Sequence, residues 1–262
     1  MWRGDYLYLI QNLVMKDFRI RYRNMSLGVL WSLLNPIVMM GVMTFVWTKI
    51  FKDGRPHFPL FVLCGMVPYN FFTIAWSGGT TSIVDSAGLI KRLPVPREVV
   101  PVSTVLSCSI HLLVQVGLLL AIAIGSHVVV NKYWFWLPVV WALEIVFVSG
   151  LSLLTAAANV FVRDTRYIVE STNLVMMWLV PVFYDFSLVK DPYTQIYDLN
   201  PLAALVIVMR RIVYEGVAPN WCSGCAEHHT LTMWKLVLAS FSVFFIGLIV
   251  FRRFKPMFYE HI

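Results

Sequence analysis

The sequence predicts an all-α integral membrane protein with six transmembrane helices. It also predicts an N-terminal amphipathic interfacial helix and a short external re-entrant helix between spans five and six. Hydrophobic residues make up 59% of the 262 positions and charged residues 13%, and the mean hydropathy is +0.72. A soluble domain carries about 25% charged residues, and a bilayer core of about 30 Å takes about 20 helical residues to cross. Six apolar stretches have that length: 27–51, 58–83, 102–127, 135–162, 169–188 and 231–251.

The segment before the first span predicts a helix that lies in the plane of the membrane surface, over residues 4–24. Aromatic and aliphatic residues recur there at four-residue spacing: Tyr6, Ile10, Val14, Phe18 and Tyr22. Cations occupy other faces: Lys16, Arg19, Arg21 and Arg23. An apolar face toward lipid tails and cations toward phosphates characterise an interfacial helix. A soluble amphipathic helix is the alternative, and a cleavable signal peptide is not expected from this pattern.

The basic residues predict the orientation of the spans. Thirteen of the 21 Lys and Arg residues flank the spans on the side that holds both termini, and eight lie on the opposite side. Loops rich in Lys and Arg stay in the cytoplasm, so both termini are expected there and 189–230 outside. The net charge of +7 sits beside apolar spans and forms no separate patch, so no nucleic-acid partner is expected. The chain is expected to be a single transmembrane domain over 1–262.

The linker 84–101 between the second and third spans combines prolines with charges. Pro96 can begin a short helix, which would present Lys91, Arg92, Arg97 and Glu98 to the cytoplasm. A plain turn with cytoplasmic charges is the alternative. Spans four and five are joined by a tight turn that contains Arg163, Asp164 and Arg166.

Two features follow the start of the fifth span. Pro181 removes a backbone donor, so we expect a kink there. Farther along, Asn200 is a plausible helix cap, Pro201 stands in a first-turn position, and Gly216 closes the segment. The apolar run from Pro201 to Tyr214 is too short to span and too apolar for a free loop, which favours a re-entrant helix.

Few ionisable groups fall inside the spans. His111 and Glu144 each lie roughly 14 Å from the start of neighbouring antiparallel spans at about 1.5 Å per residue, so they could meet near mid-membrane. We interpret them as a structural pair, with a proton relay as the alternative. The sequence contains no G-x-x-x-x-G-K-[ST] phosphate loop and no catalytic constellation. No enzyme activity, cofactor or resident metal is therefore expected of this chain.

The four cysteines divide into two pairs. Cys64 and Cys108 lie in spans, where small buried apolar residues are the simplest interpretation. Cys222 and Cys225 form CSGC in the external loop, followed by His228 and His229. A disulfide, a zinc site and unpaired thiols all remain open there.

Aromatic residues make up 15% of the chain. Those in the spans pack in the core or against lipid, or alternatively form a sugar-stacking wall along a conduit. The span aromatics to which these alternatives apply include Trp31, Trp47, Trp76, Trp178, Phe183 and Tyr184.

Several motifs together indicate a family. They are KDFRIRYRNMSLGVLWSLLNP at 16–36, IKRLPVPREVVP in the first inward linker, RDTRYIV in the second, PVFY, and LNPLAALV with RRIVYEG. In order and spacing they resemble the membrane-spanning permease of bacterial ABC exporters for polysaccharides, the Wzm/TagG-like group that moves lipid-linked O-antigen, teichoic acid or capsule. The likeness covers nearly the whole chain, although the CSGC insert is not part of the family pattern.

The resemblance implies a homodimer in the bacterial inner membrane, docked on a separate dimer of cytoplasmic ATPases that binds ATP and Mg. The 91–100 region would be the coupling helix. The residues implied in coupling are Lys91, Arg92, Leu93, Arg97, Glu98, Arg163 and Asp164. Those implied in admitting a polyprenyl-pyrophosphate-linked glycan are Lys16, Arg19, Arg21 and Arg23. The conduit would be lined by Trp31, Asn35, Trp178, Phe183 and Tyr184, and an external gate would contain Asn200, Pro201, Arg210 and Arg211.

Three other functions fit the sequence less well. A drug or small-lipid exporter permease would lack the re-entrant segment and the basic surface helix. A membrane-bound glycan-processing enzyme would need an acidic or His-rich pair at the membrane surface, where only scattered acids occur. A scaffold would not explain short inward linkers with paired charges.

Overall fold

The computed structural model describes residues 6–23, 28–52, 54–92, 95–126, 128, 130–189, 193, 194, 197, 200–219 and 233–258. All regular structure in these ranges is helical. The α-helices are α1 (Tyr6–Tyr22), α2 (Trp31–Phe45), α3 (Phe58–Asp85), α4 (Ala87–Arg92), α5 (Val99–Gly125), α6 (Leu137–Phe161), α7 (Thr165–Leu179), α9 (Pro201–Val213) and α10 (Met233–Phe254). Shorter turns are η1 (Gly28–Leu30), η2 (Val46–Ile50), η3 (Lys132–Trp136), η4 (Phe186–Leu188) and η5 (Lys255–Met257).

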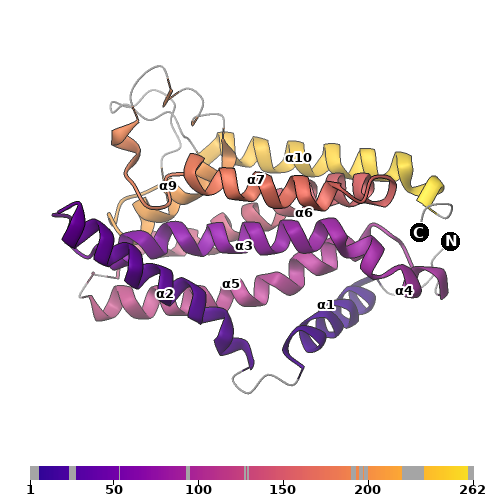
Figure 1. The fold of residues 1–262 in the computed structure, drawn as a ribbon, viewed down its shortest axis with the longest axis horizontal. Helices are drawn as coiled ribbons and strands as arrows, with labels where there is room; N and C mark the ends of the chain where they lie inside the picture. Colours follow the sequence, from indigo (N-terminus) through magenta and orange to yellow (C-terminus); the bar gives the residue numbers. More distant parts are fainter. Residues whose placement is uncertain are drawn as a thin grey trace.

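Helix α3 is the centre of the bundle. It packs against α2, α5, α6, α7 and α9, and most of its residues are buried. Figure 1 shows the long helices lying side by side along one axis, with α4 at one end and α9 at the other. We call these two ends the α4 end and the α9 end.

Within the described ranges, five helical segments are long and apolar enough to cross a membrane. They are Trp31–Ile50, Phe58–Asp85, Val99–Gly125, Lys132–Phe161 and Met233–Met257. Five of the six predicted spans are thus confirmed as helices of suitable length, with boundaries within a few residues of those expected. The predicted fifth span corresponds to α7, which has only 15 residues.

Helix α7 ends before Pro181, so the expected kink within a continuing helix is wrong. Val180 already has an extended backbone, with φ −96° and ψ 135°. A residue that precedes proline is pushed toward this conformation by the proline ring. The chain then continues through the buried residues Val182 and Phe183 without helical structure.

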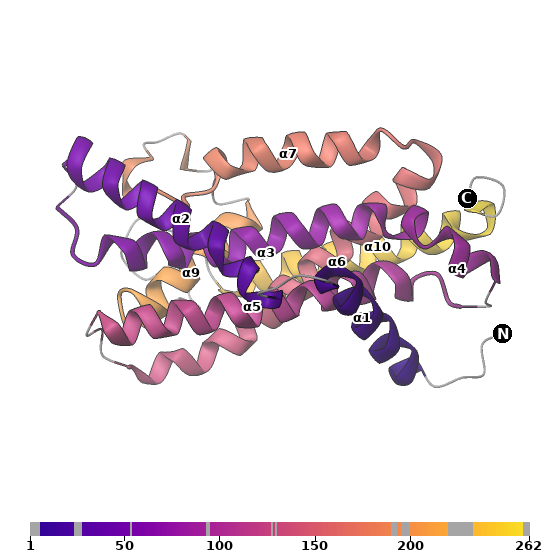
Figure 2. The same ribbon diagram turned by 60° about the horizontal axis from the view of Figure 1, so that its bottom comes forward.

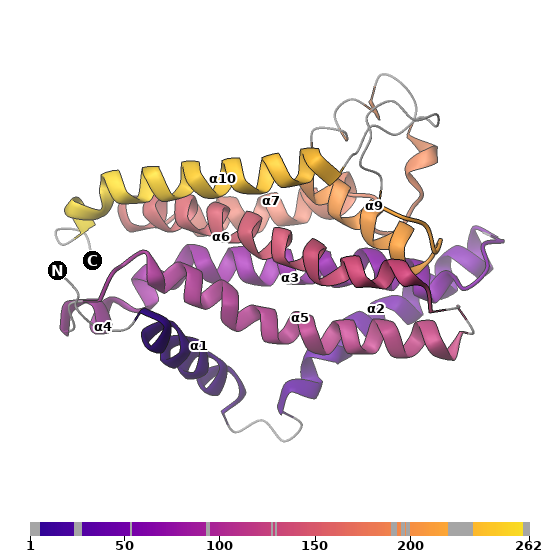
Figure 3. The same cartoon turned by 180° about the vertical axis from the view of Figure 1, so that it is seen from behind.

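Helices α6 and α10 make the most extensive helix–helix contact in the described fold and run side by side in Figure 3. Gly150 and Gly247 face each other across this pair. A Cβ atom on Gly247 would lie 2.3 Å from the carbonyl oxygen of Gly150. Glycines at a helix crossing permit such close backbone approach in membrane proteins.

The N-terminal region divides into two helices. Figure 2 shows α1 lying obliquely to the bundle and α2 crossing it separately. Helix α1 packs mainly on α5, whereas α2 packs on α3 and α5. The predicted division between an amphipathic helix and a following span is therefore observed, with α1 at Tyr6–Tyr22.

The linker at the α4 end differs from the prediction. The short helix is Ala87–Arg92, ahead of the prolines, and Pro96 lies in the turn that leads into α5. The 91–100 region is therefore not a single helix, because Val99 and Val100 already belong to α5. Proline fixes its own φ and restricts the residue before it, which separates the two helices here.

Candidate functional site

Three of the four predicted admission cations share one face of α1. Lys16, Arg19 and Arg23 line a surface cavity of about 490 Å³ on this helix. Their spacing brings them to one side, because residues three or four positions apart are neighbours on a helix. Arg23 and Arg19 are exposed, and Lys16 also pairs with Asp17 at 3.0 Å. This face can attract a phosphorylated group.

Arg21 has a different position. Its Nη2 atom donates to the sulfur of Cys108 at 3.6 Å. One turn earlier, the Asp17 carboxylate accepts a hydrogen bond from Thr104 at 3.2 Å. These contacts attach α1 to α5, so Arg21 fixes the helix in place and does not share the face of the other three cations.

The expected pair of His111 and Glu144 is not formed. The His111 ring is in hydrogen-bond contact with the Tyr22 hydroxyl, 3.0 Å from its Nε2 atom. Glu144 is fully buried, and neither carboxylate oxygen has a hydrogen-bond partner in the described ranges. Gln115, one turn from His111, donates to the carbonyl of Ser32 at 3.2 Å. His111 and Gln115 therefore connect α5 to the N-terminal helices and not to α6.

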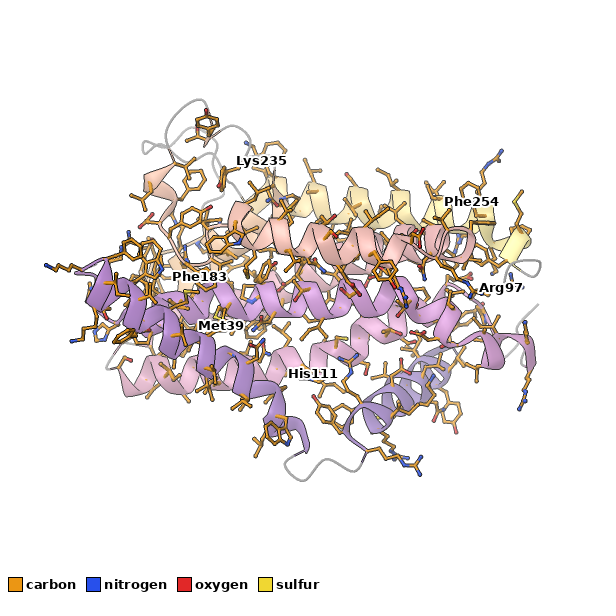
Figure 4. The ribbon with its side chains drawn as sticks, viewed as in Figure 1. Met39, Arg97, His111, Phe183, Lys235 and Phe254 are labelled. Atoms are coloured by element: carbon orange, nitrogen blue, oxygen red, sulfur yellow. The ribbon has the colours of Figure 1, made fainter. Side chains whose placement is uncertain are left out.

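The predicted coupling residues of the linker differ in how far their side chains are exposed. Lys91 and Arg92 are exposed at the end of α4, and Leu93 lies outside the described residues. Arg97 is only 5% exposed and donates to the carbonyl of Lys255 at 2.6 Å. Its expected presentation to the cytoplasm is therefore wrong, since the side chain points into the protein beside the end of α10 (Figure 4).

Glu98 is also held within the chain. Its carboxylate pairs with the Lys255 ammonium at 2.7 Å. Burial alone would raise the pKa of Glu98, but the hydrogen bond and charge of Lys255, with Arg252 nearby, hold it below the ordinary value. Glu98 therefore links the start of α5 to η5 and is not a free docking charge.

Arg163 and Asp164 are exposed in the turn between α6 and α7. Both line a cavity of about 210 Å³ between α3, α6 and α7. Asp85 at the end of α3 and Asn159 near the end of α6 also line it. Asp85 and Asn159 were not among the residues predicted from the sequence, although a polar Asn four residues before Arg163 could have indicated this site.

The predicted conduit residues are not all accessible. Trp31 is 46% exposed on α2, Asn35 follows one turn later on the same face, and Trp178 is 64% exposed on α7. Tyr184 is half-buried and donates to the carbonyl of Trp178 at 2.9 Å. Phe183 is 4% exposed within the core cluster, and Figure 4 places it toward the α9 end. A buried ring cannot line a conduit, so the expectation for Phe183 is wrong in this arrangement.

A helix, α9 (Pro201–Val213), occupies the segment where a re-entrant helix was predicted, and its re-entrant character stays a prediction. The Asn200 side chain accepts from the Leu202 backbone amide at 3.0 Å, which is the expected cap. Gly216 has a φ of +70°, and Val217 donates to the carbonyl of Arg211 at 2.9 Å, which ends the helix. Most of α9 is buried against α3, α6 and α10.

Arg210 is the central polar residue of α9. It is 5% exposed and donates to the carbonyls of Val182 at 2.5 Å and Tyr184 at 3.0 Å. Its guanidinium carbon lies 3.7 Å from the centre of the Phe61 ring, over which Arg55 also lies. Burial lowers the pKa of Arg210 to about 10, so it stays protonated at neutral pH. Arg210 thus holds the segment after α7 against α3. Phe61 and Arg55, which pack beside Arg210, were not predicted from the sequence.

The cysteines are described only in part. Cys64 and Cys108 are buried free thiols, as expected. Cys222 and Cys225 lie outside the described residues, so their three alternatives stay predictions. Within the described ranges, no three His, Cys, Asp or Glu side chains gather as metal ligands.

Comparison of the sequence with known protein families identifies the family of this chain. The model of the ABC-2 type transporter membrane family matches residues 8–214. The chain belongs to the ABC-2 type transporter family. The matched range runs from α1 to the end of α9, and α10 lies outside it.

Relatives of known function align over most of the chain. An O-antigen export system permease protein RfbA of Klebsiella pneumoniae is 26% identical over 98% of this chain and 94% of its own length. An RfbA permease of Myxococcus xanthus is 32% identical over 82% of this chain and 84% of its own length. The polysialic acid transport protein KpsM of Escherichia coli is 22% identical over 93% of this chain and 92% of its own length.

Proposed function

We propose that this chain is the transmembrane subunit of an ATP-driven exporter that moves a lipid-linked polysaccharide out of the cytoplasm. The observation that carries the proposal is the near full-length similarity to O-antigen export permeases, over 98% of this chain. Family membership supports a separate ABC ATPase as the partner, because the chain has no phosphate-binding loop of its own. ATP and Mg would bind to that subunit.

We further propose that α7 is a sixth crossing. Its 15 residues reach about 22 Å at 1.5 Å per residue, which is short of a core of about 30 Å. The extended segment that follows adds roughly 3.3 Å per residue. Non-helical backbone is tolerated at membrane depth when protein buries it, and Val180 to Phe183 are buried.

The α4 end is proposed to face the cytoplasm. Exposed cations gather at this end, among them Lys91, Arg92, Arg252 and Arg253. Positive loops remain on the cytoplasmic side. In this orientation both termini are cytoplasmic, the protein lies in the bacterial inner membrane, and α9 faces the exterior as a gate that includes Asn200, Pro201, Arg210 and Arg211.

Docking on the ATPase dimer is proposed for α4. Lys91 and Arg92 are exposed at the end of this helix and can meet acidic groups of a partner. The adjoining turn is joined to α10 through Arg97 and Glu98, so a push on α4 reaches the last helix. We leave Arg163 and Asp164 out of this docking surface, because they line a separate cavity.

The cargo is proposed to arrive at the α1 face. Lys16, Arg19 and Arg23 offer charge-assisted hydrogen bonds to a pyrophosphate group. The glycan would then pass along the exposed faces of α2 and α7, where Trp31, Asn35 and Trp178 are accessible. Because both faces are open in one chain, a second copy would be needed to enclose a conduit, which supports a homodimer.

The test is co-purification with a candidate ABC ATPase, followed by hydrolysis assays in proteoliposomes. We expect a stable complex whose ATP hydrolysis rises when polyprenyl-pyrophosphate-linked glycan is added. Stimulation by drug-like amphiphiles and not by the glycan would favour a small-molecule exporter. Nucleotide hydrolysis by this chain alone would reject the proposal.

A further inference from the structure

A polar cavity of about 380 Å³ lies between α1, the end of α3 and α5. We call it the α1–α3 cavity. Carboxylates and hydroxyls make up most of its lining, which consists of Asp17, Ile20, Arg21, Gly78, Thr81, Ser82, Asp85, Ser86 and Thr104. Ile20 is the one large apolar side chain among these. The cavity therefore suits a ligand that is rich in hydrogen-bonding groups, and it does not suit a hydrocarbon chain.

The cavity of about 210 Å³ between α3, α6 and α7 adjoins it. We call this second one the α3–α7 cavity. Thr81 and Asp85 line both cavities, so the two meet at the last turn of α3. Asp85 is exposed and forms no ion pair within the described ranges. The two cavities thus form one polar surface that crosses the end of α3.

A buried polar atom marks the α3–α7 cavity. Asn159 lines this cavity and is 3% exposed, and its Oδ1 atom has no hydrogen-bond partner within the described part of the chain. Buried polar groups in native proteins nearly always have partners, and leaving one unsatisfied is costly. A ligand that brings a hydrogen-bond donor into the cavity would satisfy this oxygen.

A missing side chain keeps the α1–α3 cavity open. Gly78 lines it, and a Cβ atom added there would lie 3.5 Å from the Thr104 methyl carbon and 4.0 Å from Nη2 of Arg21. Both neighbours also line the cavity. A larger residue at position 78 would therefore extend into the space between α1, α3 and α5 without a clash at its Cβ atom.

The two cavities continue the row of cations on α1. The surface cavity that contains Lys16, Arg19 and Arg23 also contains Ile20, which lines the α1–α3 cavity as well. Figure 1 shows α1 on one side of α3 and α7 on the other. The three cavities therefore follow one another from the cations of α1, across the end of α3, to α7.

We propose that the α1–α3 and α3–α7 cavities bind the sugar rings of the cargo that lie next to its pyrophosphate. The inference rests on the proposed function, because it takes a lipid-linked polysaccharide as the cargo. A hydroxyl group both donates and accepts hydrogen bonds. Sugar hydroxyls donate to the oxygens of Asp85, Asp164 and Asn159. They accept from the guanidinium groups of Arg163 and Arg166, and hydrogen bonds to such charged groups are the stronger ones.

The charges of the lining select against the other parts of the cargo. The pyrophosphate would bring negative charge toward Asp17 and Asp85, so it stays on the cations of α1. The polyprenyl chain would leave Asn159 and Asp85 without partners. A site that is built to hydrogen-bond hydroxyls rejects ligands that lack them, because its own polar groups then remain unpaired. The two cavities therefore distinguish a carrier with sugar from a bare carrier.

The test compares two probes on the chain reconstituted in nanodiscs with its ABC ATPase. One probe is polyprenyl pyrophosphate without sugar. The other is the same carrier with a trisaccharide isolated from the native glycan. Dissociation constants are measured by fluorescence competition. We expect the wild type to bind the trisaccharide probe roughly ten-fold more tightly than the bare carrier, as for one or two additional hydrogen bonds to charged groups.

Two variants should remove this preference. Asp85→Ala deletes the carboxylate that both cavities share, and Gly78→Leu fills the α1–α3 cavity. In each variant the two probes should bind about equally, with the dissociation constant of the bare carrier unchanged. Asp85 is exposed at the end of α3, so its variant tests the site even if Gly78→Leu disturbs the packing of α1.

Matched controls carry the same changes elsewhere. Glu170→Ala removes an exposed α7 carboxylate that lines neither cavity. Gly117→Leu adds the same side chain to α5, where a Cβ atom would have no neighbour within 4 Å. Both controls should keep the ten-fold preference. Lys16→Gln with Arg23→Gln tests the entry of the pyrophosphate separately, and it should weaken both probes alike.

The outcomes separate this inference from the proposed function. Binding of neither probe by the wild type would reject the lipid-linked cargo, and the sugar site with it. Equal binding of both probes by the wild type would reject only the sugar site. An equal loss of preference in Asp85→Ala and Glu170→Ala would also reject it, because the loss would then not depend on the cavities.

Discussion

The Lys255 ammonium lies 2.7 Å from a carboxylate oxygen of Glu98, which joins the turn before α5 to η5, directly after α10. Charge reversal of either residue, Glu98→Lys or Lys255→Glu, should lower the free energy of unfolding by about 1 kcal/mol, as for half-exposed ion pairs. Each should also weaken the coupling of ATP hydrolysis to export. The double reversal should restore most of both losses. Melting curves and coupled transport assays measure this, and additive losses in the double variant would show that the pair carries no coupling.

The same carboxylate predicts a pH dependence. The pKa of Glu98 is held below its ordinary value of 4.5, so the folded state favours the ionised form. Its contribution to stability is therefore present above pH 4.5 and is lost as the pH falls from there through the folded-state pKa. Melting temperatures of the wild type and Glu98→Gln should converge over that acid range. Parallel curves would contradict the assignment.

Arg210 should be essential for folding of the α9 end. Arg210→Ala leaves the carbonyls of Val182 and Tyr184 without their donor, and we expect a loss of about 3 kcal/mol, at roughly 1.5 kcal/mol per charged hydrogen bond. Arg210→Lys should recover only part, because an ammonium lacks the planar fork. Arg211→Ala is the control for charge, and its effect on the thermal melt should be small.

The contact between Gly150 and Gly247 should tolerate no side chain. Gly247→Ala places a Cβ atom 2.3 Å from the carbonyl oxygen of Gly150, so α6 and α10 must separate. We expect a loss of about 3 kcal/mol, at the upper end for overpacked cores. Gly117→Ala on α5 is the matched control, because its added Cβ would have no contact within 4 Å. Equal melting temperatures for the two variants would refute the close crossing.

Trp178 should act in transport and not in folding. It is 64% exposed on α7, so Trp178→Ala should leave the melting temperature nearly unchanged while export of glycan falls several-fold. Trp178→Phe should retain part of the activity through its ring. Trp234→Ala removes an exposed indole from α10 and serves as the control. Equal export by the two alanine variants would remove Trp178 from the conduit.

The sequence could predict most helices because membrane burial leaves a local signal. Twenty apolar residues in a row, or a capped start such as Asn200 with Pro201, need no knowledge of distant contacts. The expected kink at Pro181 was wrong because proline permits either a bend or an end to a helix. Which one occurs depends on what covers the freed carbonyls, and here Arg210 binds the backbone that follows.

The roles of individual charges were harder to predict. Arg97 was expected to face outward because linker cations usually do, but its partner Lys255 is 158 residues away. Likewise His111 and Glu144 matched in depth along their helices, yet depth does not fix the direction in which a side chain points. The Tyr22 contact of His111 depends on how α1 lies against α5, and no local pattern encodes that packing.

Helix α7 is attached to the centre of the bundle by polar contacts. Tyr69 of α3 donates to the carbonyl of Asn173, whose amide in turn donates to Ser77 at 3.1 Å. Its exposed face carries Tyr167, Leu174 and Trp178, and non-helical segments flank it on both sides. Moving α7 away from α3 would break only a few hydrogen bonds, and the aromatic side chains packed in the interior would stay in place. If α4 is the docking site proposed above, a push there would widen one side of the molecule while the rest of the bundle stays folded.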